Sequence, residues 1–119
     1  MKNLKLDELE LKERFSYVKS VPFDENDLRC SGAKFQVVVF KPGRRVKPHY
    51  HKKTCEIFYI LKGRGILNLG GTQFKLEKNS FFLCEPGDSH EFINNGNEDL
   101  VILIFKTNEK EDDIYWHGK

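Results

Sequence analysis

The sequence has few cysteines, and no two of them form a C-x-x-C pair. Cys30, Cys55 and Cys84 are odd in number and widely spaced, which argues against the disulfide framework of a small secreted protein. We therefore expect free thiols in a reducing compartment, the cytoplasm. There they would serve as small buried apolar side chains.

Long apolar runs and an excess of charge of one sign are also missing. Residues 1–8 contain no apolar segment of the signal-peptide type, and no uncharged stretch is long enough to cross a bilayer. The 20 basic residues are nearly balanced by 18 acidic residues, which gives a net charge of +2. This balance argues against a nucleic-acid or membrane partner. An acidic stretch at 109–113 is expected to be a solvated turn.

The chain has the apolar content of one globular domain. Its 119 residues are 39% hydrophobic and include ten phenylalanines, which is sufficient for a single core. We divide it into an N-terminal arm and first strand region at 1–32 and a β-barrel at 33–119. Residues 4–14 fit both strand and helix periodicity and are interpreted as an apolar arm. Such an arm can pack on its own barrel or pair with a second copy, so a homodimer is expected.

From residue 33 onward, short β-branched and aromatic runs alternate with Gly, Pro and Asn. This pattern is typical of an antiparallel all-β sandwich or barrel. Two hairpin turns are expected, at Gly70-Gly71 and at 95–97. The predicted strands are 34–40, 46–49, 55–61, 65–69, 72–76, 80–84, 90–94 and 100–106, with 114–116 as a last edge strand.

Three of the four histidines form a pattern with one glutamate. His49 and His51 are two residues apart, so in an extended strand both side chains project from the same face. Glu56 lies five residues beyond His51 and would occupy the opposite face of an unbroken strand. Residues 52–54 are therefore expected to bend the chain.

His90 completes the pattern. It follows a turn at Pro86-Gly87 that can direct it back toward the first group, and Asn94 lies on the same face of its strand. Three imidazoles and one carboxylate suit a divalent transition ion (Fe, Mn, Ni, Cu, Co or Zn) better than Ca or Mg. In octahedral geometry these four ligands would leave two positions open.

These residues resemble the two motifs of the cupin superfamily of small β-barrels. The first motif, G-x5-H-x-H-x4-E-x6-G, is matched at every position from Gly43 to Gly63. The second motif, G-x5-P-x-G-x2-H-x3-N, is matched at its last three fixed positions. Asn79 and Glu85 replace its first Gly and its Pro. Asn tolerates a left-handed backbone conformation, and Pro86 still restrains the turn.

The resemblance implies a cupin-type, jelly-roll-like double-sheet β-barrel that holds one divalent transition-metal ion. It assigns four residues to the metal: His49, His51, Glu56 and His90. The remaining motif residues are implied to fix turns and strand geometry: Gly43, Gly63, Pro86, Gly87 and Asn94.

Basic and aromatic residues surround this pattern. Arg44 and Arg45 belong to a basic segment beside the first motif, where a guanidinium could bind a substrate carboxylate. Phe58 shares strand parity with Glu56, and Phe92 with His90, so an apolar pocket wall is expected. A solvated loop and a plain barrel core, respectively, are the alternatives.

Three functions are compatible with such a site. A carbohydrate isomerase, epimerase or lyase needs a placed acid or base besides the metal ligands, and no titratable residue in the predicted strands clearly points inward. An oxygenase needs less, because a redox ion with open positions can take substrate and O2 side by side. We therefore favour a dioxygenase-like oxidoreductase acting on a small, anionic organic substrate. A non-catalytic ligand-binding protein is the third alternative.

Overall fold

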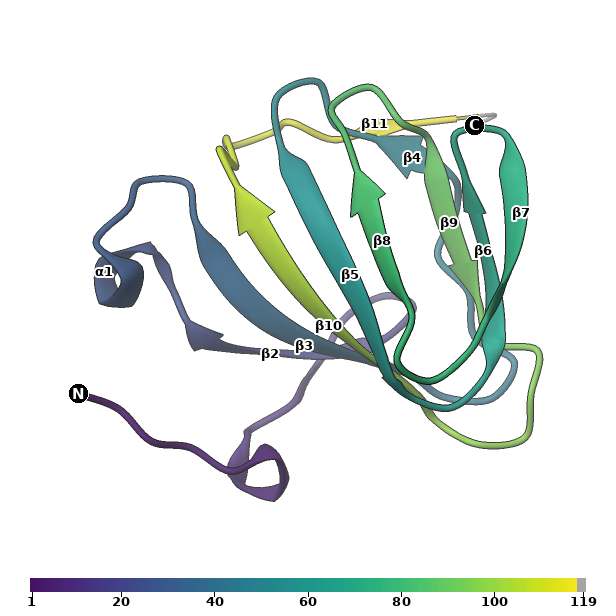
Figure 1. Ribbon diagram of the computed structural model, residues 1–119, viewed down its shortest axis with the longest axis horizontal. Coiled ribbons are helices and arrows are strands. Elements are labelled where there is room, and N and C mark those ends of the chain that lie inside the picture. The colour runs from purple at the N-terminus through teal and green to yellow at the C-terminus, as the bar shows by residue number, and fades with distance from the viewer. Residues whose placement is uncertain (118–119) are drawn as a thin grey trace.

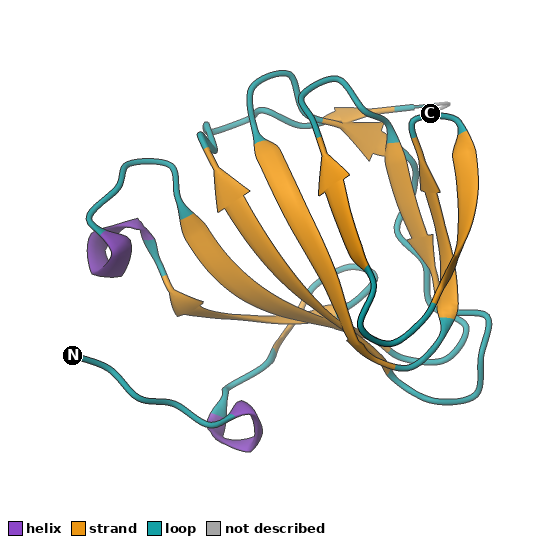
Figure 2. Cartoon of the chain, viewed as in Figure 1, coloured by secondary structure: helices purple, strands orange, loops and turns teal. Residues whose placement is uncertain are grey.

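The computed structural model describes residues 1–117 as an antiparallel β-structure with two short helical turns near the N-terminus (Figure 2). The helical turns are the 3₁₀ helix η1 (Leu6–Glu8) and α1 (Glu25–Leu28). The strands are β1 (Lys12–Glu13), β2 (Val18–Phe23), β3 (Lys34–Phe40), β4 (His49–Tyr50), β5 (Cys55–Lys62), β6 (Gly65–Leu69), β7 (Thr72–Leu76), β8 (Phe81–Cys84), β9 (His90–Ile93), β10 (Leu100–Thr107) and β11 (Tyr115–Trp116). No helix in this described part is long and apolar enough to span a membrane.

Two antiparallel sheets face each other, as the strand pattern predicts, in the jelly-roll-like arrangement that the family resemblance implies (Figure 1). The first sheet has the order β1-β2-β3-β10-β5-β8, and the second has the order β11-β4-β9-β6-β7. Strand alternation places one side-chain row of each sheet between them. In β5, Glu56, Phe58 and Ile60 are buried, whereas the intervening Ile57 is 43% exposed.

Two of the strand predictions need correction. Residues 18–23 form a strand of the first sheet, β2, which pairs with β3. Its polar residues and Pro22 hide the strand pattern, and the pairing shifts register between Ser20 and Phe23. The predicted strand at 46–49 is displaced to β4, preceded by an isolated bridge at Arg45. Pro48 has no N–H to donate and interrupts pairing just before His49.

The turns are determined by backbone conformation. Gly70 and Gly71 both have positive φ, +58° and +87°, as the predicted hairpin requires. Asn79 has φ +71°, so it takes the left-handed conformation for which the family motif has glycine. The hairpin predicted at 95–97 is wrong, because β9 and β10 lie in different sheets. That loop crosses between the sheets instead.

Apolar side chains pack on both sides of the first sheet. The main core fills the space between the sheets and includes the completely buried Phe58, Ile60 and Ile102. A smaller cluster lies on the outer face, where Leu9 of the N-terminal arm packs against Val18 and its neighbours. Leu9 therefore packs on the molecule's own sheet, whereas Leu4, Leu6 and Leu11 of the arm are exposed.

Candidate metal centre and adjoining cavity

Both sheets contribute side chains to the candidate metal centre. In the second sheet, His49 of β4 pairs directly with His90 of β9, and His51 follows two residues after His49. Glu56 reaches the same place from β5 of the first sheet. The four predicted metal ligands are therefore brought together, and all four are buried.

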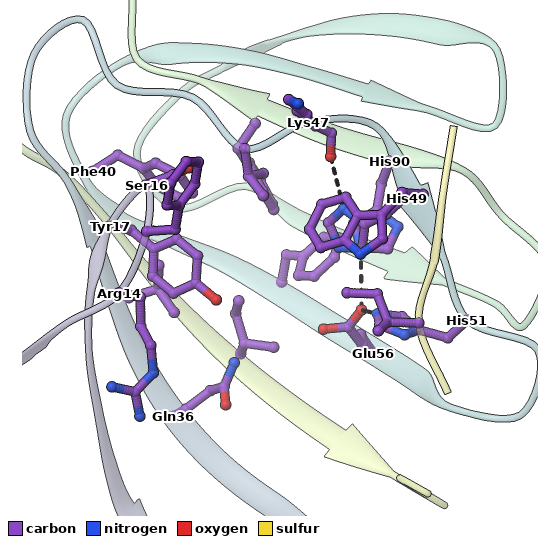
Figure 3. Close-up of a pocket in the computed structure, with 18 of the residues that line it drawn as sticks. Arg14, Ser16, Tyr17, Gln36, Phe40, Lys47, His49, His51, Glu56 and His90 are labelled. Atoms are coloured by element: carbon purple, nitrogen blue, oxygen red, sulfur yellow. Dashed lines mark hydrogen bonds and ion pairs between the residues drawn. The ribbon is translucent and has the colours of Figure 1, made fainter. Parts of the chain in front are cut away.

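The ligand atoms converge at distances suited to one ion. His49, His51 and His90 each offer a ring nitrogen within 4.8 Å of the other two. Oε1 of Glu56 lies 3.2 Å from Nε2 of His51 and 3.3 Å from Nε2 of His90 (Figure 3). Three imidazoles with an adjacent carboxylate are a donor set that divalent transition metals accept.

Backbone carbonyls select the tautomer of all three histidines. Nδ1 of His49 lies 2.8 Å from the carbonyl of Lys47, and Nδ1 of His51 lies 2.6 Å from that of Asp113. Nδ1 of His90 lies 3.2 Å from the carbonyl of Asp88. A carbonyl can only accept, so in these contacts Nδ1 donates. In a neutral imidazole, Nε2 is then left as a lone pair, the form in which histidine binds a metal.

The pKa values of His49 and His51 are shifted in opposite directions. Burial and the neighbouring His90 lower the pKa of His49 to about 4. Burial acts to lower the pKa of His51 as well, but the hydrogen bonds to Glu56 and to the carbonyl of Asp113 raise it. Burial acts to raise the pKa of Glu56, but His51 and His90 hold it well below its usual range. Oε1 of Glu56 is nevertheless a buried acceptor without a well-directed hydrogen bond. Such an atom is costly unless a cation or donor compensates it, so these residues fit a divalent ion.

Asp113 holds the bend between His51 and Glu56. Its carboxylate accepts hydrogen bonds from the backbone N–H groups of Lys52, Lys53 and Thr54 and from the Thr54 hydroxyl, at 2.8–3.0 Å. Burial acts to raise the pKa of Asp113, but these donors lower it to about 2. The expectation of a solvated acidic turn at 109–113 is therefore wrong at its last residue. Asp113 positions His51 through both its carboxylate and its carbonyl.

The three cysteines are free but differ in exposure. Cys84 is buried, with Sγ 3.4 Å from Nδ1 of His90, and burial raises the pKa of its thiol. Cys55 is half-buried and Cys30 is exposed. The expectation of three buried apolar side chains therefore holds only for Cys84.

A cavity of about 550 Å³ opens beside the histidines. Phe58 and Phe92 line it as predicted, together with Phe40 and Trp116, whose ring lies 4.9 Å from that of His49. Most of the wall is apolar, which is typical of small-molecule sites. The full lining comprises Arg14, Phe15, Ser16, Tyr17, Gln36, Val38, Phe40, Val46, Lys47, His49, His51, Glu56, Phe58, His90, Phe92, Ile104, Lys106, Ile114, Trp116 and His117.

The structure places the predicted substrate arginines elsewhere. Arg44 and Arg45 do not line this cavity. Arg45 forms an ion pair with Glu91, which itself accepts from Asn68. The cationic residues at the cavity are instead Arg14, Lys47 and Lys106.

Several polar residues of the cavity wall were not among the predicted site residues, including Arg14, Tyr17, Gln36 and Lys106. Tyr17 precedes β2, Gln36 lies in β3, and Lys106 lies in β10 with its ammonium 4.0 Å from Glu56. Lys106 shares the inward parity of Ile104, so the expectation that no titratable strand residue clearly points inward is wrong. Parity within strand 100–106 could have identified Lys106. For Tyr17 the strand itself was not recognised.

The remaining motif residues stabilise turns around the site. Gly43, Gly63 and Gly87 have positive φ, and a Cβ on Gly63 would lie 2.3 Å from the carbonyl oxygen of Asp99. Pro86 precedes Gly87, whose N–H donates to the carbonyl of His51. Asn94 is completely buried, and its side chain makes three hydrogen bonds, two of them from its amide nitrogen to the carbonyls of Phe40 and Glu98.

The fold and the histidine cluster define a small cupin-type protein. Residues 36–106 match the family described as Cupin domain, and the chain belongs to that family.

The relatives have diverse functions. The chain is 36% identical over 62 residues to an oxalate-binding protein of Thermotoga maritima, a match covering 52% of this chain and 51% of that protein. It is 35% identical over 75 residues to auxin-binding protein 1 of Arabidopsis thaliana, covering 55% and 37%. The chain thus spans about half the length of the first of these, and less of the second.

The fold extends further than the sequence match. The polyketide cyclase RemF of Streptomyces resistomycificus superposes with a TM-score of 0.85 over 100% of this chain and 87% of that chain, at 17% identity. At this identity the likeness concerns the fold alone.

Proposed function

We propose that this chain is a metal-dependent cupin that binds one divalent transition ion and a small, largely apolar organic acid in the adjoining cavity. The observation that carries the proposal is the arrangement of the three imidazoles, each with Nδ1 committed to a backbone carbonyl and Nε2 available beside Glu56. When bound, a redox-active ion would supply open coordination positions and one-electron chemistry with O2.

The favoured reaction is an oxygenation. Aromatic walls formed by Phe58, Phe92 and Trp116 can orient a planar substrate and exclude water from the reacting atoms. A carbohydrate fits less well, because its many hydroxyls need more hydrogen-bonding partners than this mostly apolar wall provides. The oxalate-binding and auxin-binding relatives support a small carboxylate as ligand.

Oxygen uptake tests the reaction. Protein purified without chelator is expected to contain about one equivalent of Fe, Mn, Cu or Ni. It should consume O2 only when a suitable aromatic acid is added. Uptake should disappear after the metal is removed and return when it is restored. Bound zinc, or no uptake with any metal, would contradict the oxygenase proposal and leave a reaction without O2 or ligand binding alone.

A proton-transferring reaction is the second candidate, and Lys106 favours it. Its ammonium lines the cavity and lies near Glu56, where a substrate proton could be exchanged. An isomerase, lyase or cyclase of this kind would work without O2. Solvent deuterium incorporation into a bound acid in the absence of O2 would identify it.

We further propose a homodimer formed by the outer face of β5 and β8. Ile57 and Leu83 pair across these strands and are 43% and 54% exposed, and Phe81 is 72% exposed. An apolar face of this kind marks an interaction surface, and a second copy can cover it symmetrically. Leu83→Glu is expected to convert the dimer to a monomer in light scattering, whereas Gln73→Glu on exposed β7 should not. A wild-type monomer at high concentration would contradict the proposal.

A further inference from the structure

The cavity has a second polar end, away from the metal ligands. Figure 3 shows Arg14, Tyr17 and Gln36 on the side opposite the three histidines and Glu56. All three line the cavity. They come from β3 and from the segment just before β2, so they form no part of the metal motifs.

Gln36 is the clearest sign of a ligand at this end. The residue is 3% exposed, and within residues 1–117 its side-chain amide makes no hydrogen bond. Oε1 is a fully buried acceptor, whereas Nε2 is not among the fully buried orphan atoms and can donate to a ligand in the cavity. A buried amide of this kind costs stability. The neighbouring positions across the sheet are apolar, Ile104 of β10 and then Phe58 of β5. An apolar residue would fill this place at lower cost, so the amide has another use.

Hydrogen-bond donors and positive charge surround the amide. The ring of Tyr17 packs on Phe40 at 5.4 Å, and in the described chain its hydroxyl makes no hydrogen bond. Arg14 donates to the carbonyl of Glu13 at 3.1 Å and has further N–H groups. Of the cationic residues that line the cavity, Arg14 lies at this end (Figure 3), whereas Lys106 lies near Glu56 at the other end.

We propose that Gln36, Tyr17 and Arg14 form a second anchoring subsite that binds a carboxylate on the far end of the substrate. The amide N–H, the phenol and the guanidinium all donate, and a carboxylate offers enough acceptor positions for the three. Resting on the proposed metal-dependent function, this assigns the substrate class. The substrate is an apolar, planar compound with one oxygen group for the metal and a carboxylate at the opposite end.

Matched acids test the subsite. Each pair consists of a monocarboxylate and the dicarboxylate of the same ring system: benzoate with terephthalate, and 2-naphthoate with naphthalene-2,6-dicarboxylate. Calorimetry measures the affinity of each acid for the zinc-loaded protein. In at least one pair, the second carboxylate should tighten binding by roughly 10-fold or more, as expected for a hydrogen-bonded charge. Gln36→Leu and Tyr17→Phe should each remove most of this difference while leaving the monocarboxylate affinity and the zinc content unchanged. Gln73→Leu, on exposed β7, should change nothing.

Three results would contradict the subsite. The first is that the monocarboxylate and the dicarboxylate bind with equal affinity in both pairs. The second is that Gln36→Leu weakens binding of both acids by the same factor, and the third is that no probe binds at all. A 6-hydroxy-2-naphthoate that binds as tightly as the naphthalene dicarboxylate would also overturn it. Gln36→Leu should melt no lower than the wild type, because its amide is unpartnered, and a large drop would indicate a structural role instead. Binding of 2-naphthoate that does not depend on zinc would contradict the proposed function, whatever the pair ratio.

Discussion

His90→Ala and His49→Ala are each expected to abolish stoichiometric binding of a divalent ion while the barrel remains folded. Each substitution removes one of three convergent imidazoles and leaves two beside Glu56. The loss of affinity should exceed the roughly 10- to 100-fold that follows when a residue hydrogen-bonded to a metal ligand is replaced. Zinc titration by calorimetry and metal analysis after dialysis measure it, and circular dichroism checks the fold.

His117→Ala is the matched control for this experiment. His117 also lines the cavity, but its ring packs against Tyr50 at 5.0 Å and it is not among the convergent ligands. It should retain a full equivalent of metal. If both ligand variants keep metal as the wild type does, the four buried side chains are structural and the proposed metal centre is wrong.

Asp113→Ala is expected to lower both stability and metal affinity. It leaves three backbone N–H groups and the Thr54 hydroxyl without their acceptor, and Thr54 is buried. At about 1–3 kcal/mol for each unsatisfied buried donor, loss of the acceptor for the N–H and hydroxyl of Thr54 alone should lower the free energy of unfolding by about 2–6 kcal/mol. Because the bend also places His51, zinc affinity should fall by roughly 10- to 100-fold. Denaturant unfolding and zinc titration give the two values.

The pH dependence of stability shows how much of the contribution of Asp113 comes from its negative charge. Its pKa in the folded protein, about 2, lies below the ordinary 3.8, so the ionised form stabilises the fold. That contribution is complete above about pH 4 and is lost as the pH falls toward 2. Asp113→Asn should therefore lose less stability than the wild type over this interval. Glu111→Ala, at an exposed position of the same turn, should match the wild type in stability and zinc affinity. An unchanged Asp113→Ala protein would contradict the assigned role.

Much of the site could be predicted from local spacing. His49 and His51 share a face because side chains alternate along an extended chain, and Glu56 can join them only if residues 52–54 bend. The structure has that bend and brings the four side chains together. Asn79 takes the left-handed conformation that its replacement of a motif glycine implies. These features depend on neighbours within a few residues.

Features that depend on distant contacts were not predictable in this way. Alternation indicates which side chains share a face, but it does not say which strand lies beside them. Strand β2 was missed because Pro22 and its polar residues interrupt the apolar alternation, and its preceding Tyr17 was missed with it. The hairpin expected at 95–97 was also wrong, because turn residues do not specify whether the next strand joins the same sheet.

The β-class, the family resemblance and the four candidate metal ligands could be predicted from the amino-acid sequence, because each is encoded in short-range spacing and side-chain chemistry. The surroundings of these ligands depend on how the chain folds in three dimensions. The tertiary structure brought Asp113 to the backbone of Thr54, 59 residues away along the chain, and placed Tyr17 and Gln36 in the wall of the same cavity. Such contacts follow from the packing of two sheets against each other, where residues remote in sequence become neighbours in order to bury the core.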